Sequence, residues 1–406
     1  MLISPYCDSG PFQGICLSRR PAGGKDLAFR LNCDTISIYG VFENYAACFA
    51  YSDLILKDCF MIGANMKTEK HKTSCILSGR NLSAILLISL FLCLSACNKT
   101  DTVNAPREKT TIAYSTANFV LVYIAFARGY FTEEGLDATP QPHAFGKLAL
   151  NAVIENKADL ATAADTPIMF AVMNGSKITT VATIQTTNRN SAILARRDHG
   201  IAKPADFKGK KVGVTLGTSA DFFAYSFLTA HGIDIGKVTL VDMRPTEMAE
   251  ALANGRVDAV AIFNPALKLL EKELGKNGIS FFDESLYTET FCLVAEQGYV
   301  KAHPETIKKA LRALIRAELF IQQHPAEAKR IVADFIKIDS ALLEEIWGIF
   351  NFRVALDQAL LVNLEDQTRW AIKKRLTART DMPNYLDYIY ISGLQAVKPE
   401  AVRIIR

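Results

Sequence analysis

Alternating polar and apolar residues predict a half-buried β-strand at Lys211–Thr215, and a tight Leu-Gly turn separates it from a helical pattern over Thr218–Thr229. Asp221 follows Thr218 at the spacing of a capping box, so we expect the helix to begin at Thr218. Free N–H groups at the start of such a helix suit an anion or a strong hydrogen-bond acceptor. Taken alone, the pattern also occurs where Thr and Ser only cap their own helix. No Gly-Lys-Ser/Thr follows at the spacing of a nucleotide-binding loop.

The same unit occurs a second time, about a hundred residues upstream. There the strand-like run Thr110–Ser115 precedes a polar turn and the apolar helical stretch Phe119–Ala127. After each unit come a second helix, a second strand and a polar turn that contains proline. The second helices are expected at 148–155 and 246–254, the matching strand segments at 156–161 and 255–260, and the turns at 165–167 and 264–265.

Strands and helices that alternate in this way, twice over, predict an α/β protein of two lobes, each a mainly parallel sheet flanked by helices. Ligands bind outside the carboxyl ends of parallel strands. Clefts between lobes are also preferred ligand sites. We therefore expect the polar turns of both lobes to converge on one cleft.

Several segments carry a resemblance to a known family. GYFTEEGLD at 129–137 is joined by NKADLATAADTP at 156–167, DFKGKKVGVTLGTSADFF at 206–223 and NGRVDAVAIFNP at 254–265. Together they resemble the solute-binding proteins of ABC importers, of the nitrate, sulfonate, taurine and thiamine-pyrimidine-precursor type. The resemblance implies the two-lobed periplasmic binding protein fold, hinged by two crossing strands, and it does not name the ligand. Asn156 stands where the family more often has glycine, which affects a turn rather than the pocket.

The expected boundaries follow from this fold. Lobe 1 begins with residues 110–195, lobe 2 occupies 196–288, and 289–406 returns to lobe 1 and adds C-terminal helices. Ala192–Arg197 and Glu289–Ala295 are the expected crossings, which places Cys292 in a buried strand as an inert small hydrophobe. Apolar stripes predict core helices from Pro304 onward, and a C-terminal tyrosine cluster at 385–390 is interpreted as packing.

Composition adds limits rather than a function. The 406 residues are enough for two domains, and half of them are apolar. The net charge is +4, without a dense basic run, so we expect no nucleic-acid partner.

Residues 66–97 resemble a lipoprotein signal peptide. A basic start precedes the apolar run Ala84–Leu94, which is too short to span a bilayer, and Leu-Ser-Ala-Cys ends at Cys97. The resemblance to a lipobox implies cleavage before Cys97 and lipid on its sulfur; the alternatives are a transmembrane stop or an ordinary signal peptide with a chance cysteine. Residues 1–65 are then interpreted as a spurious extension, the alternative being a cysteine-rich head domain. The polar segment 98–109 predicts a tether.

An enzyme is the rival hypothesis, because pyrimidine-precursor synthases that use pyridoxal phosphate and iron share this fold family. Such an enzyme needs a cysteine-rich iron motif, whereas Cys292 is the one cysteine after Cys97, and the histidines show no metal-like spacing. We therefore expect no catalytic residues, no cofactor and no metal. A sensory domain is a third class, but no kinase or transmembrane region follows.

The candidate ligand-binding residues are the polar and aromatic side chains of the matched turns. They are Ser115, Thr116, Asn118, Asp165 and Thr166 in the first lobe, and Thr218, Ser219, Ala220, Phe263 and Asn264 in the second. Hydroxyl and helix N–H donors suit a small anionic head, and Phe263 or a nearby aromatic covers the rest. Asp165 either caps a helix or accepts from an amino group, and capping is slightly favoured.

The family resemblance implies the substrate-binding component of an ABC import system. It would capture a small solute of the sulfonate, nitrate or taurine type in the cleft and deliver it to a membrane permease. The alternative is a pyrimidine-precursor-binding protein or the related synthase. We expect a monomer outside the cytoplasm, anchored by lipid at Cys97 to a bacterial membrane, in the periplasm or on the cell surface.

Overall fold

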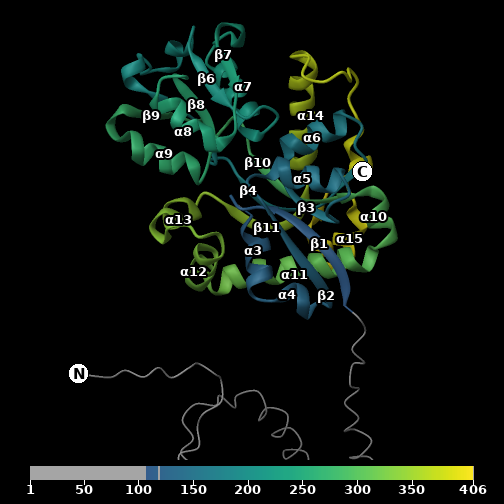
Figure 1. The fold of residues 1–406 in the computed structure, drawn as a ribbon. Coiled ribbons are helices and arrows are strands. Elements are labelled where there is room, and N and C mark those ends of the chain that lie inside the picture. The colour runs from purple at the N-terminus through teal and green to yellow at the C-terminus, as the bar shows by residue number, and fades with distance from the viewer. Residues whose placement is uncertain (1–106, 118, 406) are drawn as a thin grey trace, which may run out of the picture. The chain divides into compact units, whose positions relative to one another are not determined.

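The computed structural model describes residues 107–117 and 119–405 (Figure 1). The expected extension, the signal peptide with Cys97, most of the tether, and Asn118 lie outside the described residues. Within the described ranges, no helix combines the length and the apolar character needed to cross a membrane.

The first sheet has seven strands in the order β12-β11-β4-β10-β3-β1-β2. Neighbours within β2-β1-β3 run parallel, whereas β10 is antiparallel to both β3 and β4. The strands are β1 Glu108–Ser115, β2 Leu136–His143, β3 Leu160–Ala164, β4 Ile178–Thr187, β10 Glu289–Glu296, β11 Asn351–Asp357 and β12 Val402–Arg403.

The second sheet has five strands in the order β7-β6-β8-β5-β9. Its β7-β6-β8 part is parallel, and β5 is antiparallel to β8 and β9. The strands are β5 Ser191–Arg196, β6 Lys211–Val214, β7 Thr239–Asp242, β8 Ala259–Phe263 and β9 Gly278–Phe281.

Helices flank both sheets. In the first lobe they are α3 Val120–Ala127, α4 Tyr130–Glu133, α5 Gly146–Ile154, α6 Asp165–Met173, α10 Gln297–Ala302, α11 Pro304–Gln323, α12 Pro325–Ile336, α13 Ser340–Trp347, α14 Gln358–Lys373 and α15 Ile391–Val397. In the second lobe they are α7 Ser219–Ala230, α8 Pro245–Ala253 and α9 Ala266–Leu274. Proline occupies the first turn of α11 and of α12, where its missing N–H costs no hydrogen bond.

The predicted duplication is confirmed. β1 is flanked by β2 and β3 just as β6 is flanked by β7 and β8, with all four pairings parallel. α3 follows β1 and α7 follows β6, so each lobe presents a polar turn at the same end of its leading strand. β1 begins at Glu108, two residues before the expected start, because Glu108 and Lys109 already pair with β2.

The first crossing between the lobes differs from the prediction. Residues 191–195 pair with β8 and β9 and so belong to the second lobe, which places the crossing at 188–190. The return crossing also differs from the prediction, because residues 289–295 pair with β3 and β4 inside the first sheet; the crossing is the segment 282–288, directly before β10. Each strand that arrives from the other lobe enters its sheet from the cleft side and therefore runs antiparallel to its neighbours, which makes both sheets mixed.

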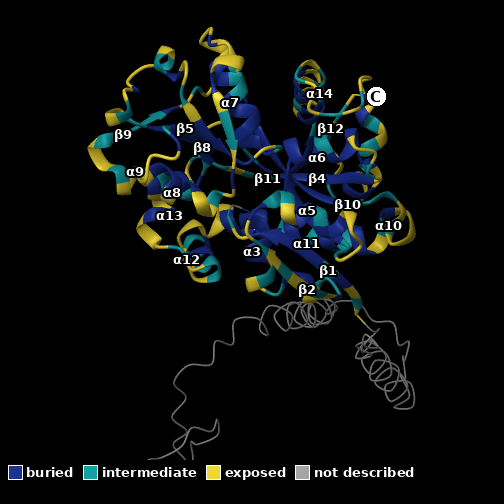
Figure 2. Cartoon of the chain, turned by 45° about the horizontal axis from the view of Figure 1, so that its top comes forward, coloured by how far each residue is buried: buried dark blue, intermediate teal, exposed yellow. Residues whose placement is uncertain are grey.

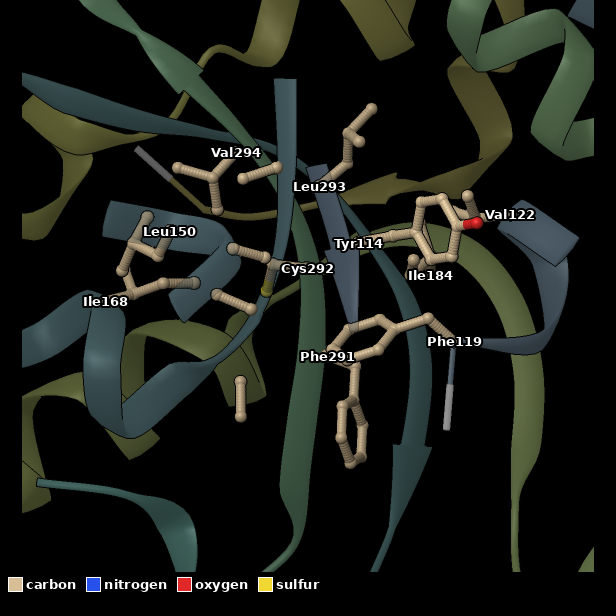
Figure 3. Close-up of a cluster of buried hydrophobic side chains, with 14 of the residues drawn as sticks. Tyr114, Phe119, Val122, Leu150, Ile168, Ile184, Phe291, Cys292, Leu293 and Val294 are labelled. Carbon is tan, nitrogen blue, oxygen red and sulfur yellow. The ribbon is translucent and has the colours of Figure 1, made fainter. Parts of the chain in front are cut away.

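The inner strands of both sheets are buried, whereas edge strands such as β2 and β7 are largely exposed (Figure 2). In β10 the side chains alternate: Cys292 and Val294 point toward Leu150 and Ile168, while Phe291 and Leu293 point to the opposite face (Figure 3). Cys292 is buried and forms no disulfide, as expected for a small hydrophobe. β10 thus joins the hinge to the core of the first lobe.

Candidate functional site

Both lobes contribute to a cavity that opens to solvent. Its wall combines phenylalanine rings and hydroxyls with one carboxylate and one ammonium group. The first lobe provides Ser115, Phe119, Phe145, Gly146, Lys147, Ala164, Pro167, Glu289 and Phe291, and the second provides Thr218, Ser219 and Phe263. The lining can both stack on a small ligand and hydrogen-bond to it.

Glu289 is the carboxylate in this wall, at the first position of β10, and it is 3% exposed. Its Oε2 accepts from Asn190 Nδ2 at 2.8 Å and from Ser191 Oγ at 3.5 Å. Its Oε1 accepts from Ser219 Oγ at the start of α7. These partners are neutral, and no described Lys, Arg or His forms a salt bridge with Glu289. Burial raises the pKa of Glu289 to about 7.

Glu289 makes the stability of the folded protein depend on pH. A carboxyl group with a raised pKa favours folding most below its unfolded pKa, near 4.5, and this contribution is lost as pH rises through about 7. The loss is on the order of 3 kcal/mol. Buried Asp165 and Asp221, each with a pKa raised to about 6, act in the same direction.

We expect the free energy of unfolding to fall between about pH 4.5 and pH 7, and Glu289→Gln to flatten that fall. Denaturant titrations at several pH values measure it. Glu318→Gln is the control, because Glu318 is buried but paired with Lys398. An equal slope in wild type and Glu289→Gln would contradict the assignment.

The start of α7 differs in detail from the predicted capping box. The helix begins at Ser219; the Thr218 hydroxyl donates to Thr215 O at 2.7 Å rather than accepting from the helix. Asp221 accepts from Gly217 N at 2.9 Å. The N–H groups of Ser219 and Ala220 have no hydrogen-bond partner among the described residues, since the first turn of a helix offers none. The predicted donors are present, and a carboxylate of the protein lies beside them.

Asp165 anchors the return crossing. Its carboxylate accepts from Tyr287 Oη, from Thr290 N at 3.1 Å, from Asn363 Nδ2 at 3.3 Å and from Thr166 N at 2.9 Å. Asp165 is the first residue of α6, yet it makes no N-cap bond, so its main contacts are with the hinge segment, β10 and α14. It is fully buried and does not line the cavity.

The two lobes touch on the cavity side. Lys147 Nζ of α5 donates to Leu216 O of the second lobe at 2.8 Å. Trp370 of α14 packs against Phe222 and Tyr225 of α7, with ring centroids 5.2 and 5.8 Å apart. The two lobes are therefore in contact beside the cavity in this structure.

Four predicted residues line the cavity: Ser115, Thr218, Ser219 and Phe263. The others take different places. Thr116 is exposed and donates to His143 O at 3.3 Å; Thr166 and Ala220 are buried beside the cavity, outside its lining; and Asn264 lines a second hollow behind the hinge. Thus the cavity draws on the predicted turns but not on every residue in them.

Tyr123 fixes the loop that carries Ser115 and Phe119. Its hydroxyl donates to Ser115 O at 2.5 Å and accepts from Phe119 N at 2.9 Å, and the whole side chain is buried. We expect Tyr123→Phe to lower the free energy of unfolding by about 1–3 kcal/mol, because both backbone groups lose their partner. Chemical denaturation measures the change; a value near zero would mean that water replaces the hydroxyl.

Comparison with known proteins decides the family. The family model described as "NMT1/THI5 like" matches residues 116–328, more than half of the chain. The chain belongs to the NMT1/THI5-like family. This result confirms the family resemblance of the sequence motifs.

Several relatives of this family member are named as binding proteins. YtlA of Bacillus subtilis (strain 168), described as a binding protein, is 26% identical over 311 residues, which are 74% of this chain and 91% of YtlA. The formylaminopyrimidine-binding protein of Halalkalibacterium halodurans is 24% identical over 265 residues, 62% of this chain and 78% of the relative. The alkanesulfonate-binding protein SsuA of Xanthomonas axonopodis pv. citri, solved with MOPS, superposes with a TM-score of 0.63 at 20% identity, covering 70% and 99% of the two chains. The last match confirms the periplasmic binding protein fold.

Sequence reasoning on this NMT1/THI5-like chain missed Glu289, Lys147 and three phenylalanines of the wall. Glu289 left one usable signal, since it is an acidic residue that opens the otherwise apolar strand ETFCLVAE. The sequence gives no such signal for Lys147 or Phe145, because lysine is common on any protein surface and phenylalanine in any core.

Proposed function

We propose that this protein is the solute-binding component of an ABC importer, which closes on a small solute and presents it to a membrane permease. The observation that supports this most is the cavity lined by both lobes, which touch beside it, because a solute there would be held by both lobes at once and released when they part. The wall offers rings and hydrogen-bonding groups for binding, so we propose capture without catalysis.

Location and partners belong to the same proposal. Export, with a lipid on Cys97, would tether the two lobes outside the cytoplasm beside their permease, as the lipobox-like ending of residues 66–97 suggests. We propose that the protein works there as a monomer.

The solute is proposed to combine two kinds of group. Ser115, Lys147 and the N–H groups of α7 are donors that suit an acidic or accepting head such as a sulfonate. Glu289 is an acceptor and suits an amino group, whose donation would relieve a buried carboxylate that has only neutral partners. An amino-bearing sulfonate such as taurine carries both groups.

A pyrimidine precursor is the second candidate. Four phenylalanine rings, Phe119, Phe145, Phe263 and Phe291, line the wall, and Glu289 lies among them. A flat aminopyrimidine could stack on such rings while its amino group donates to Glu289. One relative is named for a formylaminopyrimidine.

Thermal melting of the purified protein against a solute panel tests the function. The panel holds nitrate, ethanesulfonate, taurine, pyrimidine and an aminopyrimidine. A solute at a hundred times its dissociation constant stabilises the folded state by about 2.7 kcal/mol, a shift of several degrees. A cooperatively folded sample that no compound stabilises would count against a binding protein for these classes.

A further inference from the structure

A group of aromatic side chains joins the two lobes away from the cavity wall. Trp370 lies on α14 of the first lobe and is 5% exposed. Its ring is 5.6 Å from Phe170 of its own lobe, 5.2 Å from Phe222 and 5.8 Å from Tyr225, the last two on α7 of the second lobe. We call Trp370, Phe222 and Tyr225 the aromatic clasp; none of the three lines the cavity.

Two further contacts reinforce the clasp. Lys374 Nζ, from the first lobe just beyond α14, lies 5.2 Å from the ring centre of Tyr225. Phe222 also meets Tyr287 edge-on at 5.1 Å, and Tyr287 belongs to the return crossing, where it donates to Asp165. The clasp is thus connected to the hinge as well as to α14.

The clasp and the cavity share one helix. Ser219, which lines the cavity and donates to Glu289, begins α7, and Phe222 lies one turn further along it. α14 and α7 belong to opposite lobes and lie next to each other (Figure 1). Any separation of the lobes that frees Ser219 must also pull Phe222 and Tyr225 away from Trp370 and expose large apolar rings to water.

We propose that Trp370 is a positioning residue that holds the cleft closed through α7 without touching the solute. Its contribution is to lower the rate at which a closed cleft opens. This inference rests on the proposed function. Its structural part, the burial of the Trp370 ring by the opposite lobe, can be tested on the protein without any solute.

Tryptophan fluorescence tests the structural part. The chain has two tryptophans, and Trp347→Phe leaves Trp370 as the single emitter. In that background, Phe222→Ala removes a ring of the second lobe from Trp370. The matched variant is Phe223→Ala, because Phe223 is the next residue and its ring packs on Phe227 inside the second lobe, with ring centroids 6.0 Å apart.

We expect acrylamide to quench Trp370 several-fold more strongly in Phe222→Ala and not in Phe223→Ala. No change in either variant would overturn the inference, because Trp370 would then be buried by its own lobe alone. An equal increase in both would also overturn it, because general loosening would explain the result.

Dissociation kinetics test the functional part, with whichever panel compound stabilises the protein. Loss of the two aromatic pairs in Trp370→Ala should speed dissociation roughly 5- to 100-fold while association changes little. Trp347→Ala, which removes a ring that packs on Phe352, is the matched control. Equal dissociation rates in Trp370→Ala and wild type would overturn the inference that Trp370 holds the cleft closed. If no compound binds, the proposed function is overturned, and the quenching result alone decides whether the aromatic clasp exists.

Discussion

Replacing Glu289 by glutamine is expected to weaken the binding of an amino-bearing solute roughly 10- to 100-fold, as loss of a hydrogen bond to a charged group does. Glutamine keeps the size of the side chain and removes the charge that an ammonium group would meet. The wall has no second carboxylate to replace it. Isothermal titration of wild type and Glu289→Gln with taurine measures the difference.

Two comparisons sharpen that experiment. Ethanesulfonate lacks only the amino group of taurine, so its affinity should be low for wild type and should not fall further in Glu289→Gln. Glu318 is a buried carboxylate paired with Lys398 in the first lobe, so Glu318→Gln should leave the affinity for taurine unchanged. If Glu289→Gln bound taurine as tightly as wild type, Glu289 would not contact the amino group, although the binding function would remain.

Asp165→Ala is expected to lower the free energy of unfolding by about 3–5 kcal/mol. Alanine leaves Tyr287 Oη and Thr290 N without their acceptor inside the fold, and each unsatisfied buried donor costs about 1–3 kcal/mol. Denaturant unfolding at pH 7 measures the loss.

Asp165→Asn is the matched variant, because it keeps one acceptor oxygen. Burial raises the pKa of Asp165 to about 6, so the charged form is the costly one, and its removal offsets part of the lost bonding. We expect the asparagine variant to lose less than half as much as alanine. Equal losses would show that the charge, not the acceptor geometry, holds the hinge segment.

The duplicated architecture could be predicted from the sequence because its signals are local. The strand at Lys211 and the helix after it follow from a few neighbouring residues, and the same holds for the unit that ends in α3. The start of α7 was predicted to within one residue, although the side chains there bond differently.

The site partners and the crossing between the lobes could not be predicted, because they depend on contacts between residues far apart in the sequence. Glu289 meets Ser219 and Asn190 across 70 and 99 positions, so neither partner can be read from its own neighbourhood. The crossing at 188–190 was misplaced because β5 is buried on both faces, and an apolar run of that kind looks the same in either lobe.

The two crossings, 188–190 and 282–288, run as a pair. They leave the first lobe from strands that pair with each other, Thr187 with Glu289, and they join strands of the second lobe that also pair, Ile193 with Phe281. Two short segments that lie side by side form a hinge, about which two lobes can rotate. Opening is therefore expected to be a rotation about this one pair of segments, with the rest of each lobe moving as one body.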